Sequence, residues 1–349
     1  MAFDQIKYSL KYYLDIISQP YLSGLNNWIL LINPITMHRR SFFRAFIAAC
    51  ASFQLLPQHL FASIATTRTN FRQIYSNITL KSEFFKFLKN VFHLFPENDL
   101  HQLISDAAAS KKDDQTIYLD VQSKLDNIKP TLSTLWYAVP ALMKQKDAMA
   151  RQALQLLGEG GTYNGYLEIG SSGRYLDYLE EKINIEGERY YADGKEPGYA
   201  ITEMVDRGQI KIGAKYIALA DYKTKYADII PKESLDLVTV YIGFHHCPLD
   251  LRIPFISSIR DTLRVGGKLI LRDHDCDTEE QKALVGLAHD VFNMGTNESW
   301  EYNNKEIRNF YSLNFICTFV KEIGFSFDKR SILQKGDPTK NALMMFTKI

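Results

Sequence analysis

The sequence predicts an α/β fold: a doubly wound, mostly parallel sheet with a terminal antiparallel hairpin, preceded by an all-α N-terminal domain. From residue 164 onward, short apolar segments typical of strands alternate with segments that have helical spacing. The last two apolar segments, 325–333 and 342–349, are separated by a turn sequence, Lys335-Gly-Asp-Pro, which indicates a hairpin. The first 150 residues contain few glycines and long apolar stretches at helical spacing, which indicates helices.

Two domains are expected from this change of pattern. The chain has 349 residues, which suits two cores better than one. We expect a helical domain over residues 1–155 and a sheet domain over residues 156–349, joined at the glycine-rich segment 157–162.

The first strand of the sheet domain, residues 166–169, leads into a turn that contains Gly170 and Gly173, and a helix should begin near Tyr175. Glycine lets the backbone approach a ligand closely, and the first turn of the helix offers free N–H groups. This arrangement is typical of a nucleoside-cofactor site, in which Glu168 could accept hydrogen bonds. With only two glycines the motif is weak, and an ordinary strand-to-helix turn is the alternative.

Four later segments contain the same pattern of an apolar strand followed by a polar or acidic residue: 189–193, 216–222, 235–246 and 263–273. In the last segment we expect the end of a helix and a glycine cap at Gly266 and Gly267 before the strand. The run 235–246 is almost continuously apolar, so we expect one strand that is buried on both faces and ends in His245 and His246. Because open α/β sheets bind ligands at the carboxyl ends of their strands, these end residues should share one site.

In order and spacing, these segments resemble the class I S-adenosylmethionine-dependent methyltransferases, in particular those that act on small molecules and quinone-like lipids. The resemblance covers residues 164–349, and its motifs are Leu167-Glu-Ile-Gly-Ser-Ser-Gly, Tyr191-Ala-Asp, Ala220-Asp-Tyr, Leu235-Asp-Leu-Val with Phe244-His-His, and Leu263-Arg-Val-Gly-Gly-Lys-Leu-Ile-Leu. It implies a Rossmann-like sheet and S-adenosyl-L-methionine as the cofactor. Ser172 departs from the family pattern, which usually has a second glycine at this place.

The resemblance also implies a set of cofactor-binding residues: Glu168, Gly170, Ser171, Ser172, Gly173, Asp193, Asp221, Tyr222, Tyr241 and Ile242. The first five would hold the amino acid end of the cofactor, and Asp193 would bind both ribose hydroxyls. Asp221 would accept a hydrogen bond from the adenine amino group while Tyr222 packs against the ring. Tyr241 and Ile242 would line the sulfonium.

Candidate catalytic residues follow the fourth and fifth strands. His245 and His246 are the best candidates for a base because imidazole titrates near neutral pH, and Asp273 and His274 should lie beside them on the adjacent strand. A base is needed only if the methyl acceptor is protonated. The alternative is that these histidines cap a helix or pack against the sheet.

The same side chains, together with Cys247 or Cys276, could hold a divalent ion. However, neighbouring residues on an extended chain point to opposite faces, so His245 and His246 are not expected to bind one ion. The sequence therefore predicts no metal site.

The N-terminal part is basic: before residue 97 the acidic residues are Asp4, Asp15 and Glu83. Aromatic residues are interleaved with Lys and Arg in segments 39–46 and 81–89. Such a surface could bind nucleic acid or make peripheral contact with an anionic membrane. It could equally be the solvated face of helices that cover a Phe-rich core.

We expect a cytoplasmic protein with no transmembrane segment. The most apolar stretch, residues 28–53, is interrupted by Pro34 and by His38-Arg-Arg, and four scattered cysteines suggest a reducing compartment. The function that the sequence predicts is methyl transfer to a small or amphipathic acceptor held between the two domains. The alternatives are an RNA or cap methyltransferase that uses the basic N-terminal half, and a non-catalytic methyltransferase-like binding protein.

Overall fold

The computed structural model describes residues 69–129, 139–171, 173–198 and 213–349. The chain divides into two units, Met1–Arg44 and Ala45–Ile349, and all described residues belong to the second unit. The basic segment 39–46 and Ser172 are not among the described residues. None of the described helices has both the length and the apolar composition needed to cross a bilayer.

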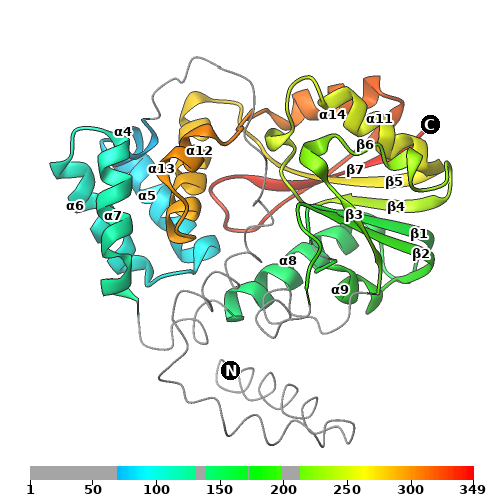
Figure 1. The fold of residues 1–349 in the computed structure, drawn as a ribbon, viewed down its shortest axis with the longest axis horizontal. Coiled ribbons are helices and arrows are strands. Elements are labelled where there is room, and N and C mark those ends of the chain that lie inside the picture. The colour runs from blue at the N-terminus through cyan, green and yellow to red at the C-terminus, as the bar shows by residue number, and fades with distance from the viewer. Residues whose placement is uncertain (1–68, 130–138, 172, 199–212) are drawn as a thin grey trace, which may run out of the picture. The chain divides into compact units, whose positions relative to one another are not determined.

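A seven-stranded sheet forms the centre of the C-terminal half (Figure 1). Its strands are β1 Thr162–Ile169, β2 Asn184–Asp193, β3 Lys215–Ala218, β4 Leu235–Val240, β5 Leu263–His274, β6 Phe325–Leu333 and β7 Asn341–Lys348. Their order in the sheet is β3-β2-β1-β4-β5-β7-β6. The pairs from β3 to β5 are parallel, and β7 is inserted antiparallel between β5 and β6. The predicted Rossmann-like sheet with a terminal antiparallel hairpin is confirmed.

Two strands are shorter than the sequence predicted. The expected strand 235–246 ends at Val240, and Phe244–His246 forms a 3₁₀ turn, η6. Likewise β3 ends at Ala218, and Ala220–Tyr222 (η4) is a turn in which all three residues have positive φ. Both strands were predicted too long because the residues beyond each strand end stay buried under helices. The apolar run in the sequence therefore continues past the last residue that pairs in the sheet.

Helices cover both faces of the sheet. α8 Val139–Leu157 and α9 Leu176–Glu180 pack on one face, where the strands contribute Tyr166, Leu237 and Ile270. On the other face α11 Arg252–Thr262 and α14 Leu313–Glu322 pack against residues that alternate with these, such as Leu167 and Val238. This alternation is the period of two expected of strands buried on both faces.

Besides the two packed faces of the sheet, a separate hydrophobic core lies among helices on one side of the sheet (Figure 1). Its helices are α4 Asn70–Tyr75, α5 Ile78–Phe87, the π-helical turn η2 Leu88–Phe92, α6 Glu97–Ser110, α7 Asp114–Ile128, α12 Glu279–Gly295 and α13 Trp300–Lys305. The helices expected before residue 130 are confirmed in the described part, but α12 and α13 from the C-terminal half complete their core. A division of the chain near residue 155 stays a prediction.

The polar segment 295–304 is helical from Trp300 onward. The side chain of Ser299 accepts a hydrogen bond from the N–H of Tyr302 and so caps α13. The ring of Trp300 is buried against Tyr118 in the helical core. The polar composition of this segment reflects capping and one exposed helix face.

Candidate functional site

The ends of the parallel strands meet at one edge of the sheet. The ladder extends one residue beyond β1 and β4, with the N–H of Gly170 donating to Ala192 O and the N–H of Tyr241 donating to Ile169 O, both at 2.8 Å. Asp193, the last residue of β2, lies beside this row. Since β1 and β4 are neighbours in the sheet but not in the sequence, this edge is the switch point at which open α/β sheets bind ligands.

Gly170 turns the chain sharply at the end of β1. Its φ is 78°, and a Cβ at this position would lie 2.2 Å from the Cβ of Ile242. Only glycine fits there, both because of the left-handed backbone and because of the contact with the chain that follows β4. The structure thus brings Gly170 and Ile242, both predicted to bind the cofactor, into contact.

Glu168 is completely buried beneath this turn. One of its oxygens accepts a hydrogen bond from the Tyr166 hydroxyl at 3.0 Å, and the other accepts from the Ser171 hydroxyl and the N–H of Tyr175. Burial raises the pKa of Glu168 to about 7. These bonds fix the turn and the start of α9, and a direct contact between Glu168 and a cofactor stays a prediction.

The two aspartates predicted to bind the nucleoside lie at the end of β2 and in the turn after β3. Asp193 is largely buried, and its Oδ1 accepts a hydrogen bond from the N–H of Gly194 at 2.7 Å. Asp221 is partly exposed in the left-handed turn after β3, and burial raises its pKa. Their strands pair in register, because Asp193 lies opposite Ala218, the last residue of β3.

The two predicted tyrosines are buried. Tyr222 packs edge-on against Phe255 of α11, with ring centroids 5.1 Å apart. Tyr241 packs against Tyr175 at the start of α9, with centroids 4.3 Å apart. Both rings therefore serve the core in this structure, and their contacts with adenine and the sulfonium stay predictions.

The catalytic candidates after β4 and at the end of β5 come together. The N–H of His245 donates to one carboxylate oxygen of Asp273 at 2.8 Å, and its Nδ1 donates to the other at 2.7 Å. His274 follows Asp273 at the end of β5, and its ring centroid is 5.6 Å from that of His245. Burial lowers the pKa of His274 to about 4 and that of His245 well below its usual value, so both rings are neutral near pH 7.

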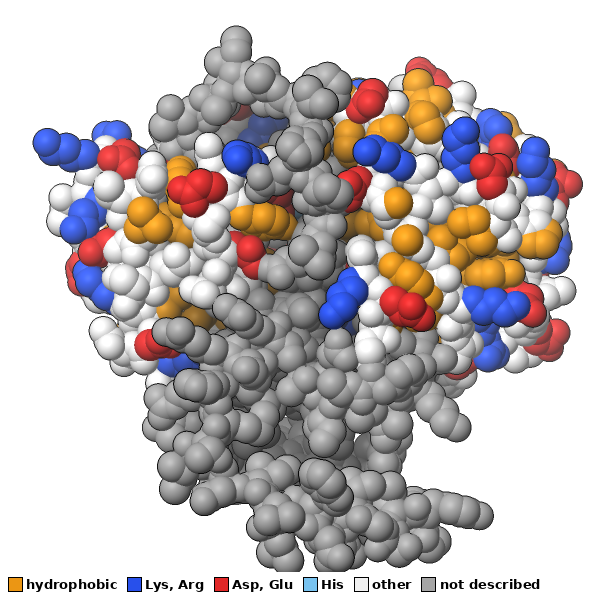
Figure 2. Space-filling model, in the orientation of Figure 1, with side chains coloured by type: hydrophobic (Ala, Val, Ile, Leu, Met, Phe, Trp, Pro, Cys, Tyr) orange, Lys and Arg blue, Asp and Glu red, His pale blue; other side chains and the backbone are white. Residues whose placement is uncertain are grey.

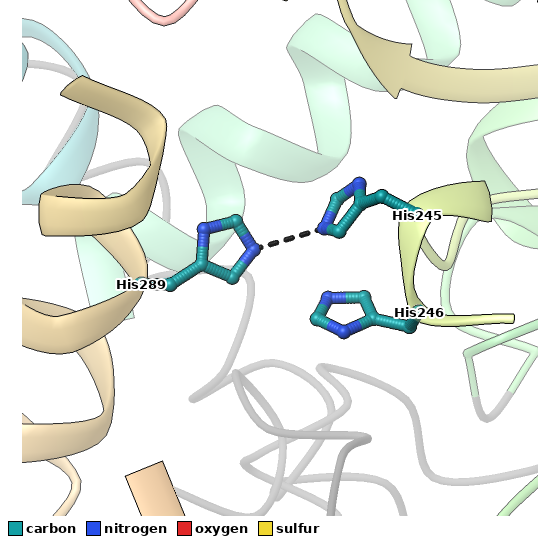
Figure 3. A group of neighbouring side chains, drawn as sticks. All are labelled: His245, His246 and His289. Atoms are coloured by element: carbon teal, nitrogen blue, oxygen red, sulfur yellow. Dashed lines mark hydrogen bonds between the residues drawn. The ribbon is translucent and has the colours of Figure 1, made fainter. Parts of the chain in front are cut away.

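The expectation that His245 and His246 point to opposite faces was wrong, because it assumed an extended chain. The 3₁₀ turn η6 carries both residues, and their ring centroids lie 4.1 Å apart. Figure 3 shows both rings directed toward α12. A Cβ on Gly243 would meet the His245 ring at 2.2 Å, so this glycine makes room for the ring.

His289 belongs to the same cluster, and the sequence analysis missed it. It lies on α12, and its Nε2 is 3.0 Å from the Nε2 of His245 (Figure 3). The available signal was a single histidine among the apolar residues of a helix, a pattern that more often belongs to a core.

A buried ion-pair network holds α12 against the chain that passes the histidines. Arg308 donates to Asp290 of α12 at 2.7 Å and forms a second ion pair with Glu306, also at 2.7 Å. The next residue, Asn309, donates its N–H to His245 O at 2.8 Å. The network therefore links the helical core to the histidine cluster.

The sequence matches no protein-family model and no curated protein. Solved structures with a similar trace include a Burkholderia thailandensis 1,6-didemethyltoxoflavin-N1-methyltransferase with bound S-adenosylhomocysteine, at 13% identity and a TM-score of 0.39, covering 68% of this chain and 92% of that one. A SAM-dependent methyltransferase from Aquifex aeolicus is similar at 13% identity and a TM-score of 0.39, covering 65% of this chain and 98% of that one. At this level of similarity neither structure assigns a reaction to this chain.

Proposed function

We propose that the protein is an S-adenosylmethionine-dependent methyltransferase that acts on a small or amphipathic acceptor. The observation that supports this most strongly is the edge of the sheet at the switch point between β1 and β4. There the left-handed turn at Gly170 contacts Ile242, and the carboxylate of Asp193 follows the adjacent strand.

The residues at this edge suit S-adenosylmethionine. A carboxylate at the end of the second strand can accept hydrogen bonds from two vicinal ribose hydroxyls, which is the part we propose for Asp193. The tight turn at Gly170 exposes backbone next to the strand ends, where the amino acid end of the cofactor would bind. When bound, the cofactor supplies a methyl group on a sulfonium, which is an activated leaving group.

We place the acceptor at the histidine cluster, which lies over the ends of β4 and β5. Holding the acceptor in line with the methyl group supplies most of the rate in such a displacement. Nδ1 of His245 is held by its hydrogen bond to the Asp273 carboxylate. The Nε2 atom of such a neutral imidazole can take a proton from an O–H or N–H group of the methyl acceptor. His245, His246, Asp273 and His274 are the proposed catalytic residues.

The described part of the basic N-terminal region favours a small acceptor over RNA. In segment 81–89, Phe84 and Phe87 are buried in the helical core, so their rings are unavailable for base stacking. Lys86 pairs with Glu83. On the face drawn in Figure 2, Lys and Arg side chains of the described residues are interspersed with Asp and Glu. A cytoplasmic location and peripheral membrane contact stay proposals.

Transfer of a labelled methyl group tests this function. The full chain is incubated with labelled S-adenosylmethionine and either a metabolite extract or total RNA. We expect a labelled small molecule in the first reaction and no labelled RNA in the second. Labelled RNA would support the RNA alternative, and cofactor binding without any transfer would support a non-catalytic binding protein.

Replacement of His246 by Ala separates catalysis from binding. If His246 takes part in proton transfer, turnover should fall by about 10²-fold or more, while affinity for the methyl donor changes little. Steady-state kinetics with the labelled donor checks this. An unchanged turnover number across the pH range would remove His246 from the catalytic residues.

A further inference from the structure

We propose that His245, His246 and His289 together bind one divalent transition-metal ion of the zinc type and leave one coordination position open. The three side chains come from two elements that are distant in the sequence, η6 and α12 (Figure 3). One ligand atom from each can be chosen so that all three lie within 4.8 Å of one another. Among the described residues, this is the one group with such spacing.

The partners of the other ring nitrogens make all three side chains suitable ligands. Nδ1 of His245 lies 2.7 Å from the Asp273 carboxylate, Nδ1 of His246 lies 2.9 Å from Ile307 O, and Nδ1 of His289 lies 2.9 Å from Val285 O. These oxygens can only accept, so each Nδ1 carries the hydrogen and each neutral ring presents a lone pair on Nε2. Metal-binding histidines usually have this arrangement, with one ring N–H donated to a carboxylate or a backbone carbonyl.

The contact between His245 and His289 needs a cation. Their Nε2 atoms are 3.0 Å apart, and two neutral rings with these Nδ1 partners would place two lone pairs against each other. A proton could lie between them only if one ring were charged. A bound metal ion resolves the conflict because it accepts both lone pairs.

The distances are compatible with a tetrahedral ion. With Zn–N bonds of about 2.1 Å, two ligand nitrogens of a tetrahedral site lie roughly 3.4 Å apart. The pair His245 and His289 is already near this value at 3.0 Å. The ligand atom of His246 lies within 4.8 Å of the others, so it would have to move closer by about 1.4 Å or less.

The surrounding charges allow a dication. The Asp273 carboxylate is bonded to His245, and a Glu306 oxygen lies 3.9 Å from Nδ1 of His246. The buried cation Arg308 is compensated by its ion pairs with Asp290 and Glu306. Three imidazoles as ligands favour ions such as Zn²⁺ or Co²⁺ over Mg²⁺ or Ca²⁺, which prefer oxygen.

The open position gives the ion a chemical use. His245 and His246 are buried and His289 is partly exposed, so we expect the open position on the side of His289. A hydroxyl bound to the fourth position would lose its proton more readily, because a divalent ion lowers the pKa of a bound oxygen. This consequence rests on the proposed methyl transfer, in which the ion would replace the imidazoles as the group that activates the acceptor. The binding of the ion does not rest on it.

Cobalt titration of the full chain tests the proposal. After treatment with a chelator, the protein is titrated with Co²⁺ alone while the visible absorption and the unfolding temperature are recorded. We expect one ion per chain, the visible bands of four-coordinate Co²⁺ and a rise in the unfolding temperature, since an ion that binds only the folded chain stabilises it.

The decisive variant is His289→Asn, with His101→Asn on α6 as the matched control. Loss of His289 should weaken Co²⁺ binding by more than about a hundredfold, beyond the tenfold to hundredfold typical of a lost outer-shell partner. His101→Asn should bind as the wild type does. Circular dichroism verifies that each variant is folded.

Two results would overturn the metal site: no Co²⁺ binding by the folded wild type, or equal affinity in His289→Asn. S-Adenosylhomocysteine binding by His289→Asn, measured in parallel, keeps the two proposals separate. It should equal that of the wild type, because His289 is not among the proposed cofactor-binding residues.

Discussion

At the scale of single residues, Gly170 was predicted as part of the site, but its physical role is broader than expected. The sequence pattern indicated a glycine that lets a ligand approach the backbone. In the structure the same glycine is also required by the packing of the chain after β4, because Ile242 occupies the space of a side chain. A contact of this kind between positions 170 and 242 is not visible in a single sequence.

Gly170→Ala should destabilise the protein by about 2 to 4 kcal/mol, because it combines backbone strain at positive φ with a steric clash. The matched control is Gly266→Ala, since Gly266 has a φ of 82° and a Cβ added there would have no neighbouring atom within 4 Å. That control should cost about 1 kcal/mol, from the backbone alone. Urea unfolding measures both changes, and equal costs would contradict the proposed packing role.

Glu168 gives a prediction about pH. Its pKa in the folded protein, about 7, is higher than the ordinary value of 4.5, so ionisation of the buried carboxyl destabilises the fold as pH rises from about 4.5 to 7. Below pH 4.5 this cost is absent. Asp177 adds to the raised pKa and Arg174 opposes it, but burial is the largest cause.

Glu168→Gln removes the titrating group and keeps the shape of the side chain. Between pH 4.5 and pH 7 the free energy of unfolding of the variant should rise relative to that of the wild type, by on the order of 3 kcal/mol. Urea unfolding at several pH values measures the difference, with the exposed Glu181→Gln as control. A difference that stays constant with pH would show that the carboxyl is not desolvated as described.

At the scale of elements, strand positions were predicted more accurately than strand ends. The strand that begins at Leu235 was predicted with the correct start. The start of β5 was wrong, because residues 263–267 were expected to be a helix end and its glycine cap, whereas the strand begins at Leu263. The end of β4 was wrong because its partner β1 turns away at Gly170, which ends the ladder while the chain remains buried. This one error led to the wrong prediction that His245 and His246 point apart.

The helix α12 has two functions that the sequence did not separate. One face completes the core of the helices before residue 130, and His289 points toward His245 and His246. The buried Arg308 connects both sides through Asp290. Long-range pairs such as these have no local signature, since they depend on how distant segments pack.

Arg308→Met should destabilise the fold by about 3 to 5 kcal/mol, because it leaves Asp290 and Glu306 buried with an uncompensated charge. Arg330→Met, which breaks an exposed pair with Asp328, is the control and should cost less than about 1 kcal/mol. Denaturant unfolding compares the two variants. A similar small cost for both would contradict a structural role for the Arg308 network.

At the scale of the whole molecule, the succession of strands along the chain could be predicted, because each strand and the turn after it have local sequence signals. The expected set of strands, including the terminal hairpin, appears in the structure in the expected sequence order. The interleaving of the helical core with α12 and α13 could not be predicted, because apolar helical spacing shows which face is buried but not against which helix. The candidate residues at or after strand ends could be named from the sequence, whereas His289, which lies on a helix, could not.

The central claim is that the strand ends at Gly170 and Asp193 bind the adenosyl cofactor. Calorimetric titration of the full chain with S-adenosylhomocysteine tests it most directly. The wild type should bind one molecule per chain, and Asp193→Ala should weaken binding by about tenfold or more through the lost ribose hydrogen bonds. No binding by the folded wild type, or equal affinity in the variant, would contradict the claim.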